Sequence, residues 1–196
     1  MQRREFLEAI AGISASVAEF SLLPLPDRVA FAQGVHARAK TAPGLRTLSR
    51  EQGALVTSIA EALLPRTETV GATDVGVTGF IDLLLTESML ERDRDRFFAG
   101  LAAIDAKSQS LHGAAFLSIH REEQQSLLAE LDSHLPPPNP TPAEAAALAR
   151  EPMSAERAFW MLKRLAVFAY FTSEAVTKDL IKAPIIPGRY DGCVPV

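Results

Sequence analysis

The four histidines and the single cysteine are the side chains of this sequence that could bind a metal or haem, or act as a nucleophile with its base. Only His120 precedes an acid, Glu123, at a spacing that places two ligands on one helix face. The residues around this pair, REEQQ, are typical of a solvated helix face. The sequence contains no H-E-x-x-H, C-x-x-C-H or G-x-S-x-G motif. It therefore predicts no metal site and no catalytic residue.

Ser173 and Glu174 form a possible nucleophile and acid, but no histidine lies close to them in the sequence to act as a base. A site assembled from distant residues, around Glu174 or His120, stays open as an alternative. No pattern distinguishes the carboxylates that could contribute to it, which are Asp74, Asp82, Glu174 and Asp191.

Cys193 is followed by three residues at the end of the sequence and has no second cysteine to pair with inside the chain. An internal disulfide is therefore excluded. Two interpretations remain, a free thiol near the C-terminus or an intermolecular disulfide with a partner subunit in an oxidising compartment.

The composition is that of a packed globular domain, because 47% of the residues are hydrophobic. The net charge of −4 excludes a general nucleic-acid binder, which needs a basic surface to neutralise phosphates. Because a single cysteine cannot form an internal disulfide, apolar packing alone must hold the fold together.

Helical spacing of apolar residues recurs along the chain, and the alternation typical of strands is missing. Ser49 and Gln52 have the spacing of a capping box, and Pro65 ends the helix that follows them. The sequence thus predicts an all-α, single-domain array of about six helices. The expected helices cover residues 49–64, 80–89, 92–112, 118–131, 143–150 and 155–180.

The N-terminus carries the features of a twin-arginine export signal. Arg3 and Arg4 are followed by Phe6, Leu7 and a mildly apolar stretch, and Ala30-Phe31-Ala32 matches the small-residue pattern of a cleavage site. We therefore expect a signal segment at residues 1–32. The alternative is an amphipathic N-terminal helix that happens to begin with arginines.

The remaining boundaries follow from changes in composition. Residues 33–47 show no clear period and are expected to be a linker, and residues 48–180 form the helical domain. Residues 181–196 contain three prolines and two glycines among apolar side chains. This extended tail must lie against its own domain or against another chain.

Three stretches together resemble the gluconate 2-dehydrogenase subunit 3 family. They are the turn Leu64-Pro65-Arg66-Thr67 with Gly71-Ala72, the stretch Tyr170-Phe171-Thr172-Ser173, and Pro187-Gly188-x-Tyr190. The similarity runs from about Gln52 to the C-terminus, and the leader with Arg3 and Arg4 is also similar to the twin-arginine leaders of that family.

This resemblance implies a non-catalytic small, or gamma, subunit of a membrane-associated FAD-dependent sugar or sugar-acid dehydrogenase. FAD then belongs to the large catalytic subunit and haem to a cytochrome subunit, with no cofactor in this chain. The small subunit would assist maturation of the flavoprotein and its export through the twin-arginine translocase. The implied location is periplasmic, peripheral to the inner membrane through the complex.

The aromatic helix and the tail are the expected partner interface, because Trp and Tyr concentrate in the energetic centres of interfaces. For Trp160, a role in the core of the domain is an equally open interpretation. An independent exported helical binding domain is the alternative to the subunit hypothesis, with an exported enzyme as a further one. The candidate interface residues are Trp160, Tyr170, Phe171, Pro187, Tyr190 and Cys193.

Overall fold

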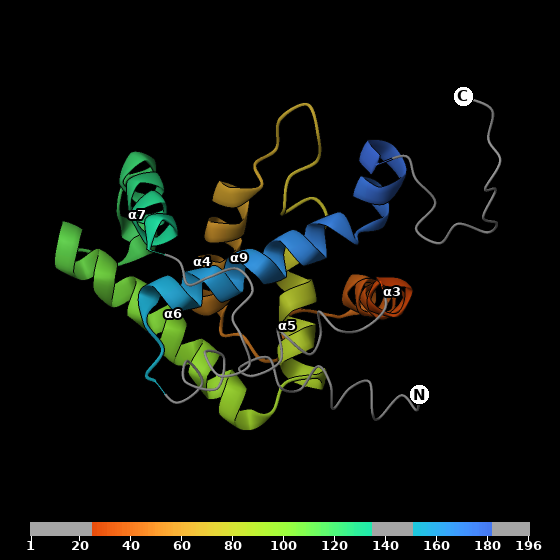
Figure 1. Cartoon of the computed structure of the whole chain (residues 1–196), viewed down its shortest axis with the longest axis horizontal. Helices are drawn as coiled ribbons and strands as arrows, with labels where there is room; N and C mark the ends of the chain where they lie inside the picture. The colour runs from red at the N-terminus through yellow and green to blue at the C-terminus, as the bar shows by residue number, and fades with distance from the viewer. Residues whose placement is uncertain (1–24, 135–150, 182–196) are drawn as a thin grey trace.

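The computed structural model describes residues 25–134 and 151–181 of the chain. This part contains six α-helices, a 3₁₀ turn and a π-helical segment, with no strand among the described residues (Figure 1). The all-α prediction is confirmed. The elements are α3 (Leu25–Thr41), α4 (Arg50–Leu63), α5 (Val77–Glu87), α6 (Glu91–His112), η1 (Phe116–Ser118), α7 (Arg121–Ser133), α9 (Ala155–Phe171) and η2 (Val176–Ile181).

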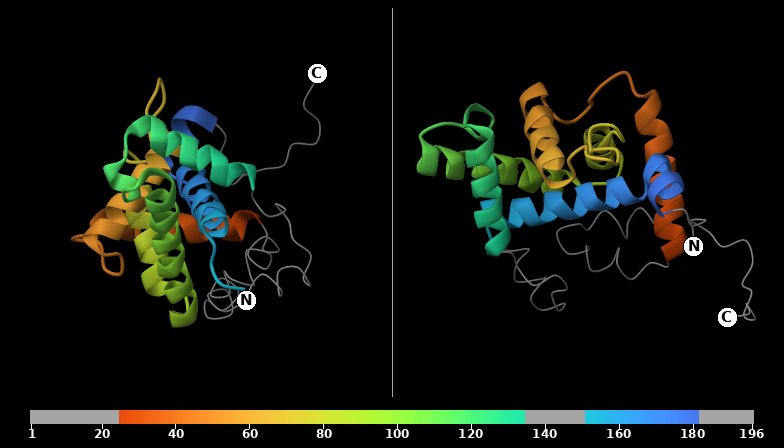
Figure 2. Two further views of the ribbon diagram at one scale, coloured as in Figure 1. Left: turned by 90° about the vertical axis from the view of Figure 1, so that its left-hand side faces the viewer. Right: turned by 90° about the horizontal axis from the view of Figure 1, so that it is seen from above.

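Helix α9 is the centre of the array, since it contacts α4, α5, α6 and α7. The views in Figure 2 show it crossing the molecule from α7 at one end to α3 at the other. Its buried side chains, among them Phe159 and Leu162, join Phe80, Phe97 and Phe116 in one hydrophobic core. Full burial of each such side chain contributes about 1.5–3 kcal/mol to folding.

Helix α4 begins as its sequence predicts. The Ser49 hydroxyl accepts a hydrogen bond from Gln52 N at 3.1 Å, and Ser49 N donates to Gln52 Oε1 at 2.9 Å. This reciprocal capping box satisfies two of the backbone N–H groups that a helix start leaves open. Asp82 of α5 holds the preceding turn, because its carboxylate accepts hydrogen bonds from the N–H groups of Arg46, Thr47 and Leu48.

Helices α6 and α9 approach closely at Gly100, which is buried. A Cβ at this position would lie 2.7 Å from Ala158 Cβ and 2.9 Å from Met153 Cγ. Only glycine fits between the two helices without a shift of one of them.

The long aromatic helix is shorter than predicted, because it ends at Phe171 instead of continuing to Leu180. At this point Thr172 Oγ1 donates to Phe168 O at 2.7 Å and Ser173 Oγ donates to Tyr170 O at 2.7 Å, and each carbonyl also accepts the backbone N–H of the same residue at 3.1 Å. Hydroxyl bonds of this kind to preceding carbonyls often bend a helix. The chain then continues into the π-helical segment η2.

Residues 33–41 are helical and belong to α3, so the irregular linker expected there is wrong as far as Thr41. Helix α3 also includes residues 25–32 of the expected signal segment, and it packs on α5. Its buried residues Val29, Ala32, Val35 and His36 explain why the segment is ordered. The prolines at 136–142, the helix expected at 143–150 and the tail from 182 lie outside the described residues.

Candidate functional site

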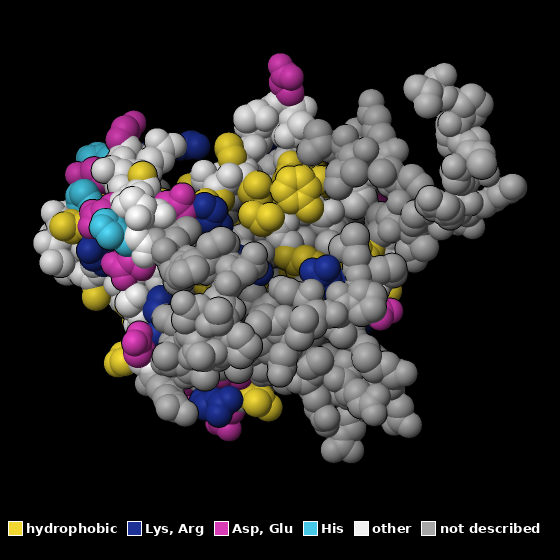
Figure 3. All heavy atoms as spheres, viewed as in Figure 1, with side chains coloured by type: hydrophobic (Ala, Val, Ile, Leu, Met, Phe, Trp, Pro, Cys, Tyr) yellow, Lys and Arg dark blue, Asp and Glu magenta, His cyan; other side chains and the backbone are white. Residues whose placement is uncertain are grey.

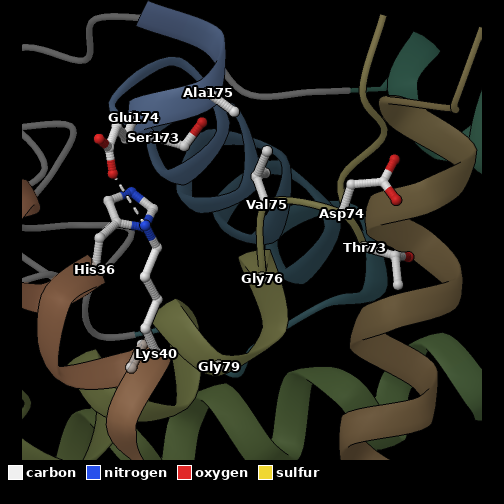
Figure 4. A pocket seen from close by; sticks show the side chains of 11 residues that line it. His36, Lys40, Thr73, Asp74, Val75, Gly76, Gly79, Ser173, Glu174 and Ala175 are labelled. Carbon is white, nitrogen blue, oxygen red and sulfur yellow. Dashed lines mark hydrogen bonds and ion pairs between the residues drawn. The ribbon is translucent and has the colours of Figure 1, made fainter.

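A pocket of about 290 Å³ opens where α3, the start of α5 and the turn after α9 meet. Its walls come from three distant parts of the sequence, around His36 and Lys40, from Thr73 to Gly79, and from Ser173 to Ala175. In Figure 4, Lys40 and Glu174 meet on one side beside His36, and Thr73 and Asp74 lie on the other side. The fold thus brings together residues that are far apart in the sequence.

Glu174 forms the polar rim of this pocket with two lysines. Its carboxylate lies 2.6 Å from Lys178 Nζ and 3.1 Å from Lys40 Nζ. Hydrogen bonds and charge attraction from Lys178 and Lys40 lower the pKa of Glu174 to about 2. A carboxylate held in this form is a poor proton acceptor at neutral pH.

His36 of α3 lies behind the rim and is buried against Phe80 of α5 and Thr172 after α9. Burial lowers the pKa of His36, a hydrogen bond to the Ala169 carbonyl partly opposes this, and the Lys40 charge adds to the lowering. The imidazole Nε2 lies 3.3 Å from Thr172 Oγ1. This contact joins α3 to the turn after α9. His36 therefore acts as a tie between helices.

Ser173 does not form an activated nucleophile in this arrangement. Its hydroxyl donates to Tyr170 O at 2.7 Å and accepts from Val176 N at 3.4 Å. A nucleophilic serine needs a base within hydrogen-bond reach, and His36 instead faces Thr172. Figures 1 and 2 place α7, which His120 precedes, and η2 at opposite ends of α9, so Glu174 and His120 share no site.

The pair His120 and Glu123 is part of a helix start. Glu123 Oε2 accepts a hydrogen bond from His120 N at 2.8 Å, and its other oxygen lies 3.7 Å from His112 Nδ1. Within residues 25–134 and 151–181, no three His, Cys, Asp or Glu side chains gather as a metal site would require.

One face of α9 is the most accessible apolar feature of this helix. Val167 and Phe171 are 37% and 43% exposed, and they share a face with Trp160 and Arg164 by their helical spacing. The Arg164 guanidinium lies 5.0 Å from the centre of the Trp160 ring, a cation–π contact. We call these four residues the α9 face. Figure 3 shows hydrophobic side chains gathered where α9 crosses this side of the molecule, with basic side chains beside them.

The interface residues expected from the sequence thus fall into three groups: those on the α9 face, those that are buried, and those outside the described part of the chain. Trp160 and Phe171 belong to the α9 face, whereas Tyr170 points into the core with only 5% of its surface exposed. Its hydroxyl donates to Val70 O at 2.6 Å. Arg3, Arg4, Phe6, Leu7, Pro187, Tyr190 and Cys193 lie outside the described residues.

The contacts of His36 and Lys40 with the turn after α9 were not expected from the sequence. The signal that could have found their helix is the spacing of Val29, Ala32, His36 and Ala39, which is that of one helix face. Residues 25–41 were instead assigned to a leader and a linker.

In the described part of the chain, no helix combines the length and the apolar character that crossing a bilayer requires.

The described residues form an all-α domain that exposes an apolar face on α9. The family model of gluconate 2-dehydrogenase subunit 3 matches residues 50–188. The chain belongs to this family, whose name describes a subunit of a dehydrogenase complex. No curated protein and no solved structure shows a significant match to the chain. Helix α3 lies entirely outside the matched residues.

Proposed function

We propose that this chain is the non-catalytic small subunit of a membrane-associated FAD-dependent sugar or sugar-acid dehydrogenase. Its role is to bind the large flavoprotein subunit, assist its maturation and provide the signal for its export. The observation that carries this proposal is the family match over residues 50–188. In the described pocket the Ser173 hydroxyl donates to Tyr170 O and Glu174 is paired with two lysines, so neither residue is activated as nucleophile or base, which favours a binding role for this chain.

In this proposal FAD is held by the large subunit, and haem by a cytochrome subunit of the same complex. The assembled complex resides in the periplasm, peripheral to the inner membrane. Arg3, Arg4, Phe6 and Leu7 form the signal read by the twin-arginine translocase. Folded export suits such a partner, because a flavoprotein can then load its cofactor in the cytoplasm.

The α9 face supplies the docking surface on the described part of the chain. Its aromatic and aliphatic side chains can fill apolar pockets, and Trp160 and Arg164 are of the residue types that dominate binding energy. Arg164 adds a positive charge to this face, whereas the neighbouring Lys163 is paired with Asp132 of α7. We therefore expect the partner surface to be apolar with acidic residues at its rim. Pro187, Tyr190 and Cys193 of the tail extend this interface.

Purification of the chain through an affinity tag from its native host tests the subunit role. We expect a much larger protein with the absorption spectrum of bound flavin to co-purify. The double variant Val167→Glu/Phe171→Glu should lower its yield at least about tenfold, because two charges would be buried at the interface. Recovery of the tagged chain alone would favour the independent binding domain.

Leu90→Glu/Leu117→Glu is a matched control, because these leucines are 51% and 43% exposed and lie outside α9. The control should keep the flavoprotein. Equal loss in both double variants would place the interface elsewhere.

The export role has its own test. Changing Arg3 and Arg4 to lysine should leave both this chain and the flavoprotein in the cytoplasm while their association persists. Normal export of the flavoprotein from these cells would contradict the role of the signal, without affecting the subunit role.

A further inference from the structure

We infer that α3 is a permanent part of the mature protein, and that any removal of the leader occurs before Leu25 and not after Ala32. This inference rests on the proposed export function for the existence of a leader. It concerns a different property, which is the point where the leader ends and the folded protein begins.

The small-residue motif Ala30-Phe31-Ala32 lies in the middle of α3, which extends from Leu25 to Thr41. Ala32 is fully buried in the hydrophobic core, with Phe31 packed against that core. Cleavage after Ala32 would leave nine residues of the helix, from Gln33 to Thr41. A helix of this length is marginal without the packing of its missing half.

Polar contacts fasten the remaining half of α3 to the end of α5 and to the turn after α9. Arg38 pairs with Glu87 at the end of α5 at 3.1 Å. His36 bonds Thr172 after α9, and Lys40 pairs with Glu174 at 3.1 Å. The exposed ion pairs contribute little energy individually. Together with the buried face of the helix they fix one register of α3 on the domain, and the part of that face formed by Val29 and Ala32 would be lost by cleavage after Ala32.

The route of export makes this packing decisive. A twin-arginine substrate crosses the membrane folded, so α3 is already docked when a signal peptidase meets it. Proteolysis requires local opening of the chain, and buried helices open rarely. The 24 residues before Leu25 suffice for a leader, since signal peptides are typically about 15–30 residues long.

Two substitutions at the motif separate a cleavage site from a core helix. Ala30→Glu and Ala32→Glu both destroy the small-residue motif to the same extent. Ala30 is exposed, whereas Ala32 is fully buried. In the purified full-length chain, we expect Ala32→Glu to lower the Tm by at least about 5 °C and Ala30→Glu to change it by less than about 1 °C. Equal Tm values for the two variants would overturn the inference.

The mass of the chain recovered from the periplasm gives the second measurement. We expect wild type and Ala30→Glu to have the same N-terminus, at or before Leu25. A wild-type chain beginning at Gln33, or at any residue after Leu25, overturns the inference. If no chain reaches the periplasm, the export function fails, and the Tm comparison of Ala30→Glu with Ala32→Glu still decides whether α3 belongs to the fold.

Discussion

The Tyr170 hydroxyl donates a 2.6 Å hydrogen bond to the carbonyl of Val70, which lies 100 positions earlier in the chain. This bond fastens the loop between α4 and α5 to the C-terminal part of α9. Tyr170→Phe keeps the ring and its 5.3 Å contact with Phe171 but leaves the carbonyl without this donor. We expect a loss of about 1 kcal/mol in the free energy of unfolding, measured by denaturant titration, with co-purification of the flavoprotein unchanged. If Tyr170→Phe no longer co-purifies with the flavoprotein while its stability is unchanged, Tyr170 contributes to the interface instead.

Substitution of Asp82 should lower the free energy of unfolding more, because its buried carboxylate accepts hydrogen bonds from three backbone N–H groups at 2.7–2.9 Å. Asp82→Asn removes the charge and turns an amide NH₂ toward one of these donors. We expect a loss of about 2–3 kcal/mol in the free energy of unfolding. Asp95→Asn on the exposed side of α6 is the control and should change stability by less than about 0.5 kcal/mol. Similar values for both variants would show that the N–H cluster is not held by charge.

Gly100 and Gly34 both lie inside helices but differ in their surroundings. Gly100→Ala would place a methyl group 2.7 Å from Ala158 Cβ, so α6 and α9 must separate, at a cost of about 1–3 kcal/mol in stability. At Gly34 the nearest atom would lie 3.4 Å away, on the flexible Arg38 side chain. Gly34→Ala should therefore raise stability by up to about 1 kcal/mol. Thermal unfolding of both variants checks the pair, and a tolerated alanine at residue 100 would contradict the close packing.

The burial of His36 makes the stability of the protein depend on pH. Its pKa is lowered below 6.5 in the folded chain, so the unfolded chain binds more protons in the interval below that value. The free energy of unfolding is then fully present above pH 6.5 and decreases as the pH falls toward the lowered pKa. His36→Gln, which can still donate to Thr172, should flatten this decrease.

Tm measured between about pH 5 and 7.5 tests this dependence, since the ordinary histidine pKa lies within that interval. Identical slopes for His36→Gln and wild type would assign the pH dependence to other groups.

The sequence predicted the helices whose ends carry their own signals. Ser49 and Gln52 define the start of α4, and the charged run from Arg92 to Arg96 begins α6 within one residue of its expected position. The end of α9 was not predictable from periodicity, because apolar residues continue beyond it. At the break, the hydroxyls of Thr172 and Ser173 bond preceding backbone carbonyls, an arrangement that often bends a helix.

The pocket and the burial of Tyr170 depend on tertiary contacts that no local pattern encodes. Trp160, Tyr170 and Phe171 are similar residue types on one helix, yet their accessibility differs because neighbouring positions on a helix face different directions. Helix α3 shows the opposite case. The spacing of its apolar residues is typical of a helix, but the small-residue motif at residues 30–32 led to the expectation of a leader.

The contacts between α3 and the C-terminal turn also set an order of events during synthesis. His36 and Thr172 are separated by 136 positions, and Lys40 and Glu174 by 134. Ribosomes add about 5–20 residues per second, so α3 waits roughly 7–27 s before these partners exist. Its docking onto the end of α9 can therefore occur only after residues 172–174 have been made. Helix α3 is one of the first described elements to be synthesised, and it is fully packed only after the whole of α9 exists.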